Sequence, residues 1–413
     1  MRKNAGMNTD VLVVGAGPAG SAAATWAARS GFEVLLVDAA EFPRDKPCGD
    51  GLTPRAVAEL QSLGMAEWLA ERPRNNGVRM YGFGSMHEVP WNGPHLPIWG
   101  SAAARTELDD AIRRNAMAAG AQFRSGLRAQ GVRLGSAGSV QAVQFDANGA
   151  PVEINCKRLI VADGVRSQLG RILGRIWHRT TVYGVAARAY VQSGRHDDPW
   201  ITSHLELRDA SNALLSGYGW IFPLGNGSVN IGVGTLATEK RPADVKLKQL
   251  LQFYVDQQRA SWQLGSDVML PSSAMLPMGG AVSNVAGPNW MLIGDAAACV
   301  NPLNGEGIDY GLETGRLAVE LLHEHDYREA WKSTLQQHYG EAFSIARRLG
   351  ALLTVPWFLP AFGPIGMRSR AIMDVALRVM GNLITDADRD TVARAWNTAG
   401  KASQLFDARK PWS

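Results

Sequence analysis

The sequence predicts an α/β protein, α+β overall, in which a Rossmann-type dinucleotide-binding domain carries an inserted antiparallel β-sheet domain and a C-terminal helical region. Three observations in the 413 residues predict this architecture. A Gly-x-Gly-x-x-Gly turn follows an apolar strand at residues 9–14. Alternating apolar runs, separated by turn residues, fill residues 182–233 and predict antiparallel strands. A buried-strand pattern returns at residues 289–293, so the dinucleotide-binding domain is discontinuous.

The remaining elements follow from local periodicity. An alanine-rich helix at residues 21–30 and a strand at 33–38 complete the opening β-α-β unit. Further elements are predicted as helices at 55–69, 105–119 and 307–323 and a strand at 158–161. The predicted segments are dinucleotide-binding at 1–75, 103–177 and 286–345, sheet-forming at 76–102 and 178–285, and helical at 346–413.

Composition and charge narrow the class of partner and the compartment. Charged residues make up 19% of the chain and the net charge is +4, which is too small to predict a nucleic-acid partner. The three cysteines have no Cys-x-x-Cys spacing, so we expect neither a disulfide framework nor a metal site. Cys156 and Cys299 are predicted to be core residues, and this cysteine usage fits a reducing, cytoplasmic compartment.

The first candidate site is the glycine-rich turn at residues 15–20. Its first glycine permits the tight turn, its second lets backbone amides approach a pyrophosphate, and its third lets the next helix pack on the strand. Asp38 ends the second strand, where a carboxylate accepts hydrogen bonds from ribose hydroxyls and repels a 2′-phosphate. The predicted contacts from the turn are Gly15, Ala16, Gly17, Pro18, Ala19 and Gly20.

A second constellation favours FAD over NAD as the dinucleotide. The strand at residues 289–293 leads directly to Asp295, a carboxylate suited to the ribityl hydroxyls of a flavin. A glycine-rich turn then precedes the helix that starts at Gly307 and Ile308. Backbone amides and the positive end of that helix would face the flavin ring where negative charge develops on reduction. NAD has no ribityl chain and needs no such second site, so we expect the cofactor to be FAD.

Two further segments resemble the flavoproteins typified by aromatic hydroxylases, which have three such motifs. Asp163 and Gly164, in the run LIVADGVRS, are similar to the middle motif of that group. Arg105, in ARTELDDAI, is similar to the arginine that contacts the flavin. The resemblance covers most of residues 9–345 and implies an FAD-binding domain of the aromatic-hydroxylase type.

Other runs resemble the geranylgeranyl reductases, flavoenzymes that saturate isoprenoid double bonds. These runs are PCGDGLTPRAV, GYGWIFPLGNG, LPMGGAVS and WMLIGDAAACVNPLNGEGIDYGLETGRLA. They are most similar to an actinobacterial branch that reduces one double bond, in the β-isoprene unit, of the menaquinone tail. The resemblance implies an FAD-dependent oxidoreductase acting on CH–CH groups, with menaquinone or a related prenyl lipid as substrate. The implied contacts are Pro47, Cys48, Gly49 and Asp50 for the cofactor and Tyr218, Trp220 and Phe222 for the substrate.

The chemistry of such a reduction suggests one catalytic candidate, Cys48. An isolated alkene is a poor hydride acceptor, so hydride delivery is expected to be coupled to protonation of the other carbon. Arg44 and Lys46 would lower the pKa of the Cys48 thiol if they lie close to it, and the thiol would then relay a proton or contact the substrate. The alternative is a small buried residue in a tight turn. The aromatic residues at 218–222 have a similar alternative, because aromatic residues alternating on a strand usually form core.

An apolar stretch at residues 349–367 contains no charged residue but has prolines at 356, 360 and 364, which we expect to break it repeatedly. Arginines at 347, 348, 368 and 370 flank it. An interrupted helix is too short to span a bilayer, so we expect this stretch to lie in the membrane interface. The alternative is a helical cap on the substrate channel. The first interpretation predicts a peripheral or monotopic protein on the cytoplasmic face of the cell membrane.

Several other functions share these motifs. A geranylgeranyl-type reductase of another prenyl lipid and a flavin-dependent monooxygenase or halogenase have the same fold, although the segment YGWIFP differs from the halogenase pattern WxWxIP. An electron-transfer module would need four iron–sulfur ligands, which three scattered cysteines cannot supply. A flavoprotein that binds quinone or lipid without turnover is a further alternative. The chain has no second complete Gly-x-Gly-x-x-Gly motif, so the electron donor is expected to be a separate, unidentified partner.

Overall fold

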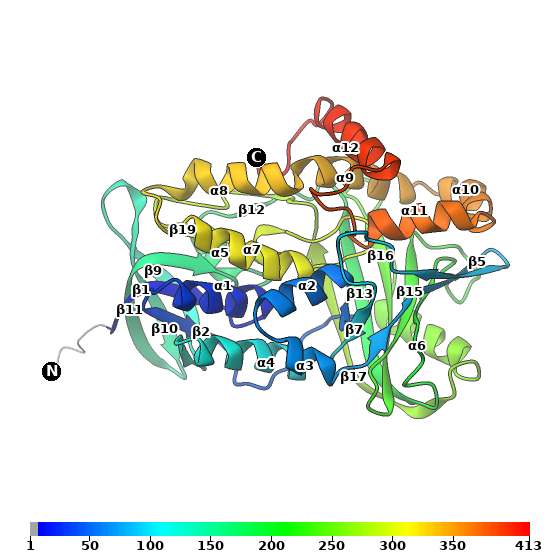
Figure 1. Cartoon of the computed structure of the whole chain (residues 1–413), viewed down its shortest axis with the longest axis horizontal. Helices are drawn as coiled ribbons and strands as arrows, with labels where there is room; N and C mark the ends of the chain where they lie inside the picture. The colour runs from blue at the N-terminus through cyan, green and yellow to red at the C-terminus, as the bar shows by residue number, and fades with distance from the viewer. Residues whose placement is uncertain (1–6) are drawn as a thin grey trace.

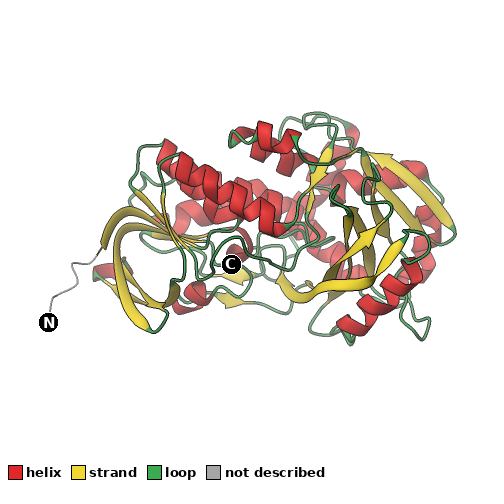
Figure 2. Ribbon diagram, turned by 90° about the horizontal axis from the view of Figure 1, so that it is seen from below, coloured by secondary structure: helices red, strands yellow, loops and turns green. Residues whose placement is uncertain are grey.

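The computed structural model describes residues 7–413, and its two large sheets lie side by side along the long axis of the molecule (Figures 1 and 2). The strands of the first sheet are β1 (Met7–Val14), β2 (Val34–Val37), β8 (Gln122–Arg124), β9 (Arg128–Leu134), β10 (Val140–Ala147), β11 (Ala150–Val161) and β19 (Trp290–Leu292). Their order is β8-β2-β1-β11-β10-β9, and β19 pairs with the end of β11. The pairs among β8, β2, β1, β11 and β19 are parallel, as in a Rossmann-type sheet.

Helices pack on this first sheet or on one another beside it. They are α1 (Pro18–Arg29), α2 (Pro54–Ser62), α3 (Ala66–Ala70), α4 (Arg105–Ala118), α5 (Gln168–Ile172), α7 (Ile308–Glu320), α8 (Tyr327–Leu335) and α9 (Glu341–Leu353). α1 packs against both α4 and α7 (Figure 1). A Cβ at Gly315 of α7 would lie 2.7 Å from the Ala19 carbonyl oxygen of α1, so this crossing is closer than a side chain permits. The three glycine-containing motifs are thereby brought to one edge of the sheet.

The second sheet contains β5 (Gly77–Gly82), β6 (Ser85–Pro90), β13 (Tyr183–Ser193), β14 (Ile201–His204), β15 (Gly217–Pro223), β16 (Ser228–Ala237) and β17 (Leu264–Pro277). The strand order is β17-β13-β16-β15-β14-β5-β6. Every pair is antiparallel except β14 with β5, so the sheet is mixed at the point where residues 76–90 join it. α6 (Leu247–Gln258) packs on β13, β16 and β17. The predicted fold class, a Rossmann-type domain with an inserted sheet domain, is confirmed.

Short strands and the last helices connect the two sheets. β3 (Gly51–Leu52), β4 (Arg74–Asn75) and β7 (Gly100–Ala102) form one small sheet, and β12 (Ile176–Trp177) pairs with β18 (Val282–Ser283). The last helices are α10 (Phe358–Met367), α11 (Arg370–Met380) and α12 (Thr391–Gln404). α10 contacts β5 and α11 contacts β6, whereas α12 packs on α9. The C-terminal region therefore covers parts of both domains.

Two expectations about helices are wrong in detail. The helix expected at residues 55–69 is divided into α2 and α3, because Gly64 between them adopts φ +79°. The segment with three prolines is broken only once, between α9 and α10 around Pro356. Pro360 lies in the first turn of α10, where its missing N–H would have no intrahelical partner, and Pro364 lies inside the helix without ending it.

Within residues 7–413, no single helix is both long enough and apolar enough to cross a bilayer. The segment Tyr327–Leu353 and α10 pass that criterion only as a pair, and they are bent by 111° at the break between them.

Candidate active site

A single cavity of about 1630 Å³ lies between the two sheets. At one end it is lined by the Gly15–Pro18 turn and Asp38, and at the other by Phe362 and Met367 of α10. All of the predicted site residues line this cavity except Ala16 and Gly20, which are part of the same turn. The structure thus gathers residues from all three motifs and from the aromatic strand around one space.

The three glycines of the first turn are constrained in different ways. A Cβ at Gly15 would lie 2.2 Å from the Ala162 carbonyl oxygen, and one at Gly20 would lie 1.8 Å from the Gly15 carbonyl oxygen. Both contacts are impossible, so these two glycines are required by the fold itself. A Cβ at Gly17 would meet only the ends of side chains, the nearest at 3.4 Å. Gly17 therefore leaves open space at the N-terminus of α1, where a helix presents unpaired N–H groups to an anion.

Two arginines flank that open space. Arg105 is buried and forms a bidentate ion pair with Asp109, with Nε–Oδ1 and Nη2–Oδ2 distances of 2.6 and 2.7 Å. Arg44 binds the same carboxylate at 3.0 Å. The Nη2 atoms of Arg44 and Arg105 lie 3.4 and 3.8 Å from the position of a Gly17 Cβ. Two guanidinium groups share one buried carboxylate, which leaves positive charge beside the turn for a diphosphate. Sequence reasoning had considered Arg44 only as a neighbour of Cys48.

The predicted carboxylates of the first two motifs make contacts within their own turns. Asp38 accepts hydrogen bonds from the backbone N–H groups of Ala16 and Ala40 at 2.7 and 2.8 Å. It thereby fixes the glycine-rich turn to the end of β2. Asp163 accepts hydrogen bonds from the Ser167 hydroxyl and the Leu169 N–H at 2.6 and 2.8 Å. Both carboxylates border the cavity, and a carboxylate oxygen retains lone pairs for a further donor.

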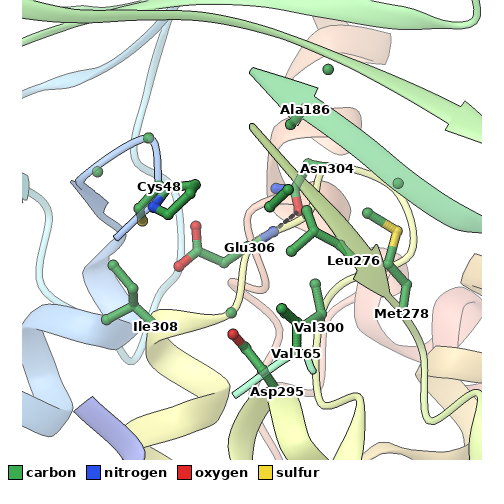
Figure 3. A pocket seen from close by; sticks show the side chains of 18 of the residues that line it. Cys48, Val165, Ala186, Leu276, Met278, Asp295, Val300, Asn304, Glu306 and Ile308 are labelled. Atoms are coloured by element: carbon green, nitrogen blue, oxygen red, sulfur yellow. Dashed lines mark hydrogen bonds between the residues drawn. The ribbon is translucent and has the colours of Figure 1, made fainter. Parts of the chain in front are cut away.

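The third motif is tied to the loop that contains Cys48. Lys46 Nζ lies 2.8 Å from Asp295 Oδ2, so the loop at residues 44–51 is held against the end of β19. Gly307 is the N-cap of α7, and Ile308 is its first residue. Its open N-terminus therefore borders the cavity next to Asp295, as Figure 3 shows.

Asp50 joins the same loop to the second sheet. It is fully buried and accepts hydrogen bonds from the Tyr190 hydroxyl at 2.7 Å and from the Asn230 side-chain amide at 2.8 Å. Burial raises the pKa of Asp50 to about 6, although these two hydrogen bonds oppose the rise. The carboxylate therefore bonds to β13 and β16 across the junction between the domains.

The expected lowering of the Cys48 pKa is wrong. Arg44 and Lys46 are engaged by Asp109 and Asp295, and the cation that acts on Cys48 is Arg105. Burial raises the pKa of the Cys48 thiol, and the positive charge of Arg105 offsets only part of that rise. Cys48 is thus a neutral thiol on the wall of the cavity, with its sulfur accepting a hydrogen bond from the Asp50 N–H at 3.4 Å. Cys156 and Cys299 are buried, as expected.

The aromatic residues of β15 share one face of the strand and line the cavity in a row. The Tyr218 hydroxyl donates to the Asn304 carbonyl at 2.7 Å, and Trp220 Nε1 donates to the Asn230 side chain at 2.9 Å. Phe222 packs so closely on the Cys48 loop that a Cβ at Gly49 or Gly51 would lie 3.1 Å from its ring. These residues therefore act both as packing between the domains and as cavity wall.

Sequence reasoning missed two parts of the lining. Glu306 projects into the cavity and its carboxyl group points toward Cys48 (Figure 3). The sequence placed Glu306 in the turn before α7 but did not predict it as a site residue. Residues of α10 and α11 form the far wall, namely Phe358, Leu359, Phe362, Met367, Ile372 and Met373. The expectation of a channel cap at residues 349–367 had pointed to this wall without naming α11.

The residues present fit FAD. The open space at Gly17 beside Arg44 and Arg105 suits a diphosphate, and Asp38 and Asp295 lie on the same cavity for the ribose and ribityl hydroxyls. The cavity is also larger than a cofactor site needs, because it continues past β15 to α10.

Comparisons with known proteins agree with this geometry. A family model described as an FAD binding domain matches residues 8–349. The menaquinone reductase of Mycolicibacterium smegmatis is 61% identical over 98% of this chain and 100% of its own length. The digeranylgeranylglycerophospholipid reductase 1 of Methanopyrus kandleri is 30% identical over 84% of this chain and 91% of its own.

A solved structure has the same fold. The crystal structure of a geranylgeranyl bacteriochlorophyll reductase-like protein from Thermoplasma acidophilum aligns with a TM-score of 0.73 and 21% identity, covering 96% of each chain. The chain thus belongs to the FAD binding domain family, as a flavoprotein of the geranylgeranyl reductase group that its motifs had indicated.

Proposed function

We propose that the protein is an FAD-dependent reductase that saturates one double bond, in the β-isoprene unit, of the isoprenoid tail of menaquinone. The observation that carries this proposal is the continuity of one cavity from the Gly15–Pro18 turn to the apolar wall of α10 and α11. Two relatives are named for menaquinone and for a digeranylgeranyl lipid. The structural feature common to those two molecules is an isoprenoid chain, which favours the tail over the quinone ring as the part that is reduced.

In this proposal the first turn and its arginines hold the cofactor. Gly17, Arg44 and Arg105 bind the diphosphate, whereas Asp38 and Asp295 accept hydrogen bonds from the sugar and ribityl hydroxyls. When bound, FAD supplies a hydride from its reduced flavin ring. The electron donor that reduces it is a separate partner. The remaining contacts are those predicted from the motifs, at residues 15–20, 47–50, 163–164 and 307–308.

The substrate tail is proposed to lie along the aromatic row of β15. Tyr218, Trp220 and Phe222 form one side of this path, and Phe362 and Met367 of α10 form its far end. An isoprene unit has no polar group, so its position is determined by shape and by exclusion of water. Cys48 lies on the wall of this path near the turn before α7, and we assign it the relay of a proton to the alkene.

The outer surface of α10 and α11 is proposed to contact the cytoplasmic face of the cell membrane. Trp357 and Ile365 are 61% and 58% exposed, and Arg368 and Arg370 beside them are exposed as well. This arrangement suits an interface in which apolar side chains enter the acyl region and arginines bind headgroups. The inner side of the same two helices lines the cavity, so the tail would enter between them without crossing water. Arg347 and Arg348 instead bond within the protein, to Gly279 and to residues of α12 and the segment after it.

The function is tested by mass spectrometry of quinones from cells with and without the gene. Loss of the gene should leave menaquinone lighter by the mass of two hydrogen atoms, and restoring the gene should reverse this. An unchanged menaquinone beside a mass shift in another prenyl lipid would identify a different substrate of the same group. Oxygen consumption coupled to insertion of an oxygen atom would instead identify a monooxygenase.

Gly17→Val should abolish FAD binding without unfolding the protein. The valine side chain has ordinary contacts at its Cβ but fills the space beside α1 that a diphosphate needs. Flavin absorbance per mole of protein and chromatography of the released flavin measure this directly. Ala118→Val places a valine side chain at the exposed end of α4 and should keep full FAD content. A yellow Gly17→Val protein containing intact FAD would contradict the assignment of this turn.

Cys48→Ala should keep FAD but slow alkene saturation by roughly two to four powers of ten, the usual effect of losing a proton-transfer group. Cys48→Ser should recover little of this rate, because a hydroxyl is a much weaker acid than a thiol. Single-turnover assays with chemically reduced flavin measure the step independently of the electron donor. If both variants stay within a few fold of the wild-type rate, Cys48 only packs.

The protein should sediment with vesicles of anionic lipid, and high salt should release only part of it, because apolar contacts survive screening. Replacing Trp357 and Ile365 together by Asp should release most of it. Leu405→Asp is the control, since Leu405 is 82% exposed but lies after α12. Equal vesicle binding by both variants would refute the membrane face on α10 and leave these helices as a channel cap.

A further inference from the structure

Glu306 is a carboxyl group that none of the motifs explains. It lies in the turn before α7, lines the main cavity and points toward Cys48 (Figure 3). Its Oε1 atom is buried and has no hydrogen-bond partner among residues 7–413. A buried carboxyl oxygen without a partner destabilises a protein, so its presence next to the proposed reaction path requires a reason.

The backbone of the turn fixes the position of Glu306. Its N–H donates to the Asn304 side chain at 2.9 Å, and its carbonyl accepts from the Asn301 N–H at 2.8 Å. Asn304 is held in turn by the Tyr218 hydroxyl at 2.7 Å and by its own amide, which donates to the Met380 carbonyl at 2.8 Å. Contacts from β15 and α11 therefore immobilise the turn that presents the carboxyl group.

The surroundings of Glu306 favour its protonated form. Burial and the negative charge of Asp309 raise the pKa of Glu306 well above its usual range, and the N–H groups of Asp309 and Ile308 offset only part of this. Cys48 and Tyr218 face the same space, and burial raises the pKa of each. The surroundings of all three groups therefore favour the neutral, proton-carrying form.

Asp309, whose charge acts on Glu306, is bonded to a residue that lines a second cavity. It is fully buried in α7 and accepts a hydrogen bond from the Asn382 side-chain amide at 2.8 Å. Burial raises the pKa of Asp309 to about 6, opposed by Asn382 and by the charge of Arg55 and reinforced by Glu313. A carboxyl group with a pKa close to the operating pH is suited to both accepting and donating a proton.

The second cavity has a volume of about 160 Å³ and is lined by Asn382, the hydrogen-bond partner of Asp309. Arg55, Glu313 and Asn382 form its inner wall. Gln337 and His338, which are exposed, form part of its outer wall, so it reaches the surface of the protein. It is polar and large enough for several water molecules.

We propose that Glu306 is the acid that supplies the proton for tail reduction, and that Asp309 and the polar cavity behind it replace that proton from solvent. This inference rests on the proposed function. It assigns the proton source for the Cys48 relay and separates the path of the proton, through α7, from the path of the lipid, past α10.

Saturation of one double bond requires one hydride and one proton. Bound, reduced FAD would supply a hydride for one alkene carbon, and the Cys48 S–H bond breaks as its proton forms a C–H bond at the other carbon. The Glu306 O–H bond breaks and its proton passes to the Cys48 sulfur, so the alkene gains two hydrogen atoms and Glu306 becomes a carboxylate. Asp309 then returns a proton to Glu306 and takes one from water in the polar cavity.

Infrared spectroscopy of the purified protein tests the protonation state without any turnover. At about pH 8, where a group with a pKa of about 6 is ionised, wild-type protein should retain the carbonyl band of a protonated carboxylic acid. Glu306→Gln should remove that band. Glu320→Gln, the same change at an exposed position of α7, should leave it. Asp309→Asn removes a neighbouring negative charge, so the band should disappear at a lower pH than in wild type.

Single-turnover kinetics test the relay. Glu306→Gln should slow saturation by roughly two to four powers of ten, as Cys48→Ala does. The double variant should be no slower than the slower single variant, because both residues act in one series. Glu320→Gln should match wild type. The proposal would be overturned if the rate of the double variant fell by the product of the two single factors. It would also be overturned if the Glu306→Gln rate stayed within a few fold of wild type.

The two proposals fail in different ways. Wild-type protein that leaves every prenyl tail unreduced refutes the proposed function and, with it, proton donation to an alkene. Wild-type protein that reduces the tail while Glu306→Gln keeps the carbonyl band refutes only the assignment of Glu306.

Discussion

The segment at residues 44–51 is the constraint on which the rest of the site depends. Its charged residues alternate between the two domains: Arg44 and Lys46 pair with Asp109 and Asp295 of the first, whereas Asp45 pairs with Arg188 of the second. Asp50 adds hydrogen bonds to the second sheet. Each pair is at least partly buried, so removing one partner would leave an uncompensated charge between the sheets. Two domains that are discontinuous in sequence are thereby held at one distance, and the cavity between them has a defined shape.

The same junction keeps ionic groups paired and leaves the unpaired groups neutral. Arg44, Arg105 and Lys46 at the nucleotide end are paired with carboxylates. Toward the lipid end, Cys48, Tyr218 and Glu306 lie in surroundings that raise the pKa of each. An apolar tail gains nothing from a charge, and an isolated charge there would be strongly destabilised. A titratable group without an ionic partner is therefore least destabilising in such a chamber when it is a neutral proton donor.

The dinucleotide-binding elements could be predicted from the sequence because each is marked by residues close to it in the chain. The Gly15–Gly20 turn, Asp38 and the strand before Asp295 each lie within a few residues of the element they define. The sign of the Cys48 pKa shift was wrong, because Arg44 and Lys46 are neighbours in sequence but bind carboxylates elsewhere. Glu306 was missed for the complementary reason. Its importance comes from its place in the cavity, where it shares one space with Tyr218 of β15 and faces Cys48, and no spacing in the sequence reveals this.

The apolar segment at residues 349–367 left two interpretations open, a membrane contact and a channel cap, and α10 and α11 have a suitable side for each. One side lines the cavity with Phe362, Met367 and Met373, and the other exposes Trp357 and Ile365. Bringing an isoprene unit through water would cost about 0.8 kcal/mol for each buried methylene group, or roughly 4 kcal/mol for its five carbons. A helix pair that borders both the chamber and the proposed bilayer surface removes that cost, because the tail exchanges one apolar environment for another. The break around Pro356 serves this geometry, since a straight continuation of α9 would carry the chain away from the mouth of the cavity instead of turning it by 111°.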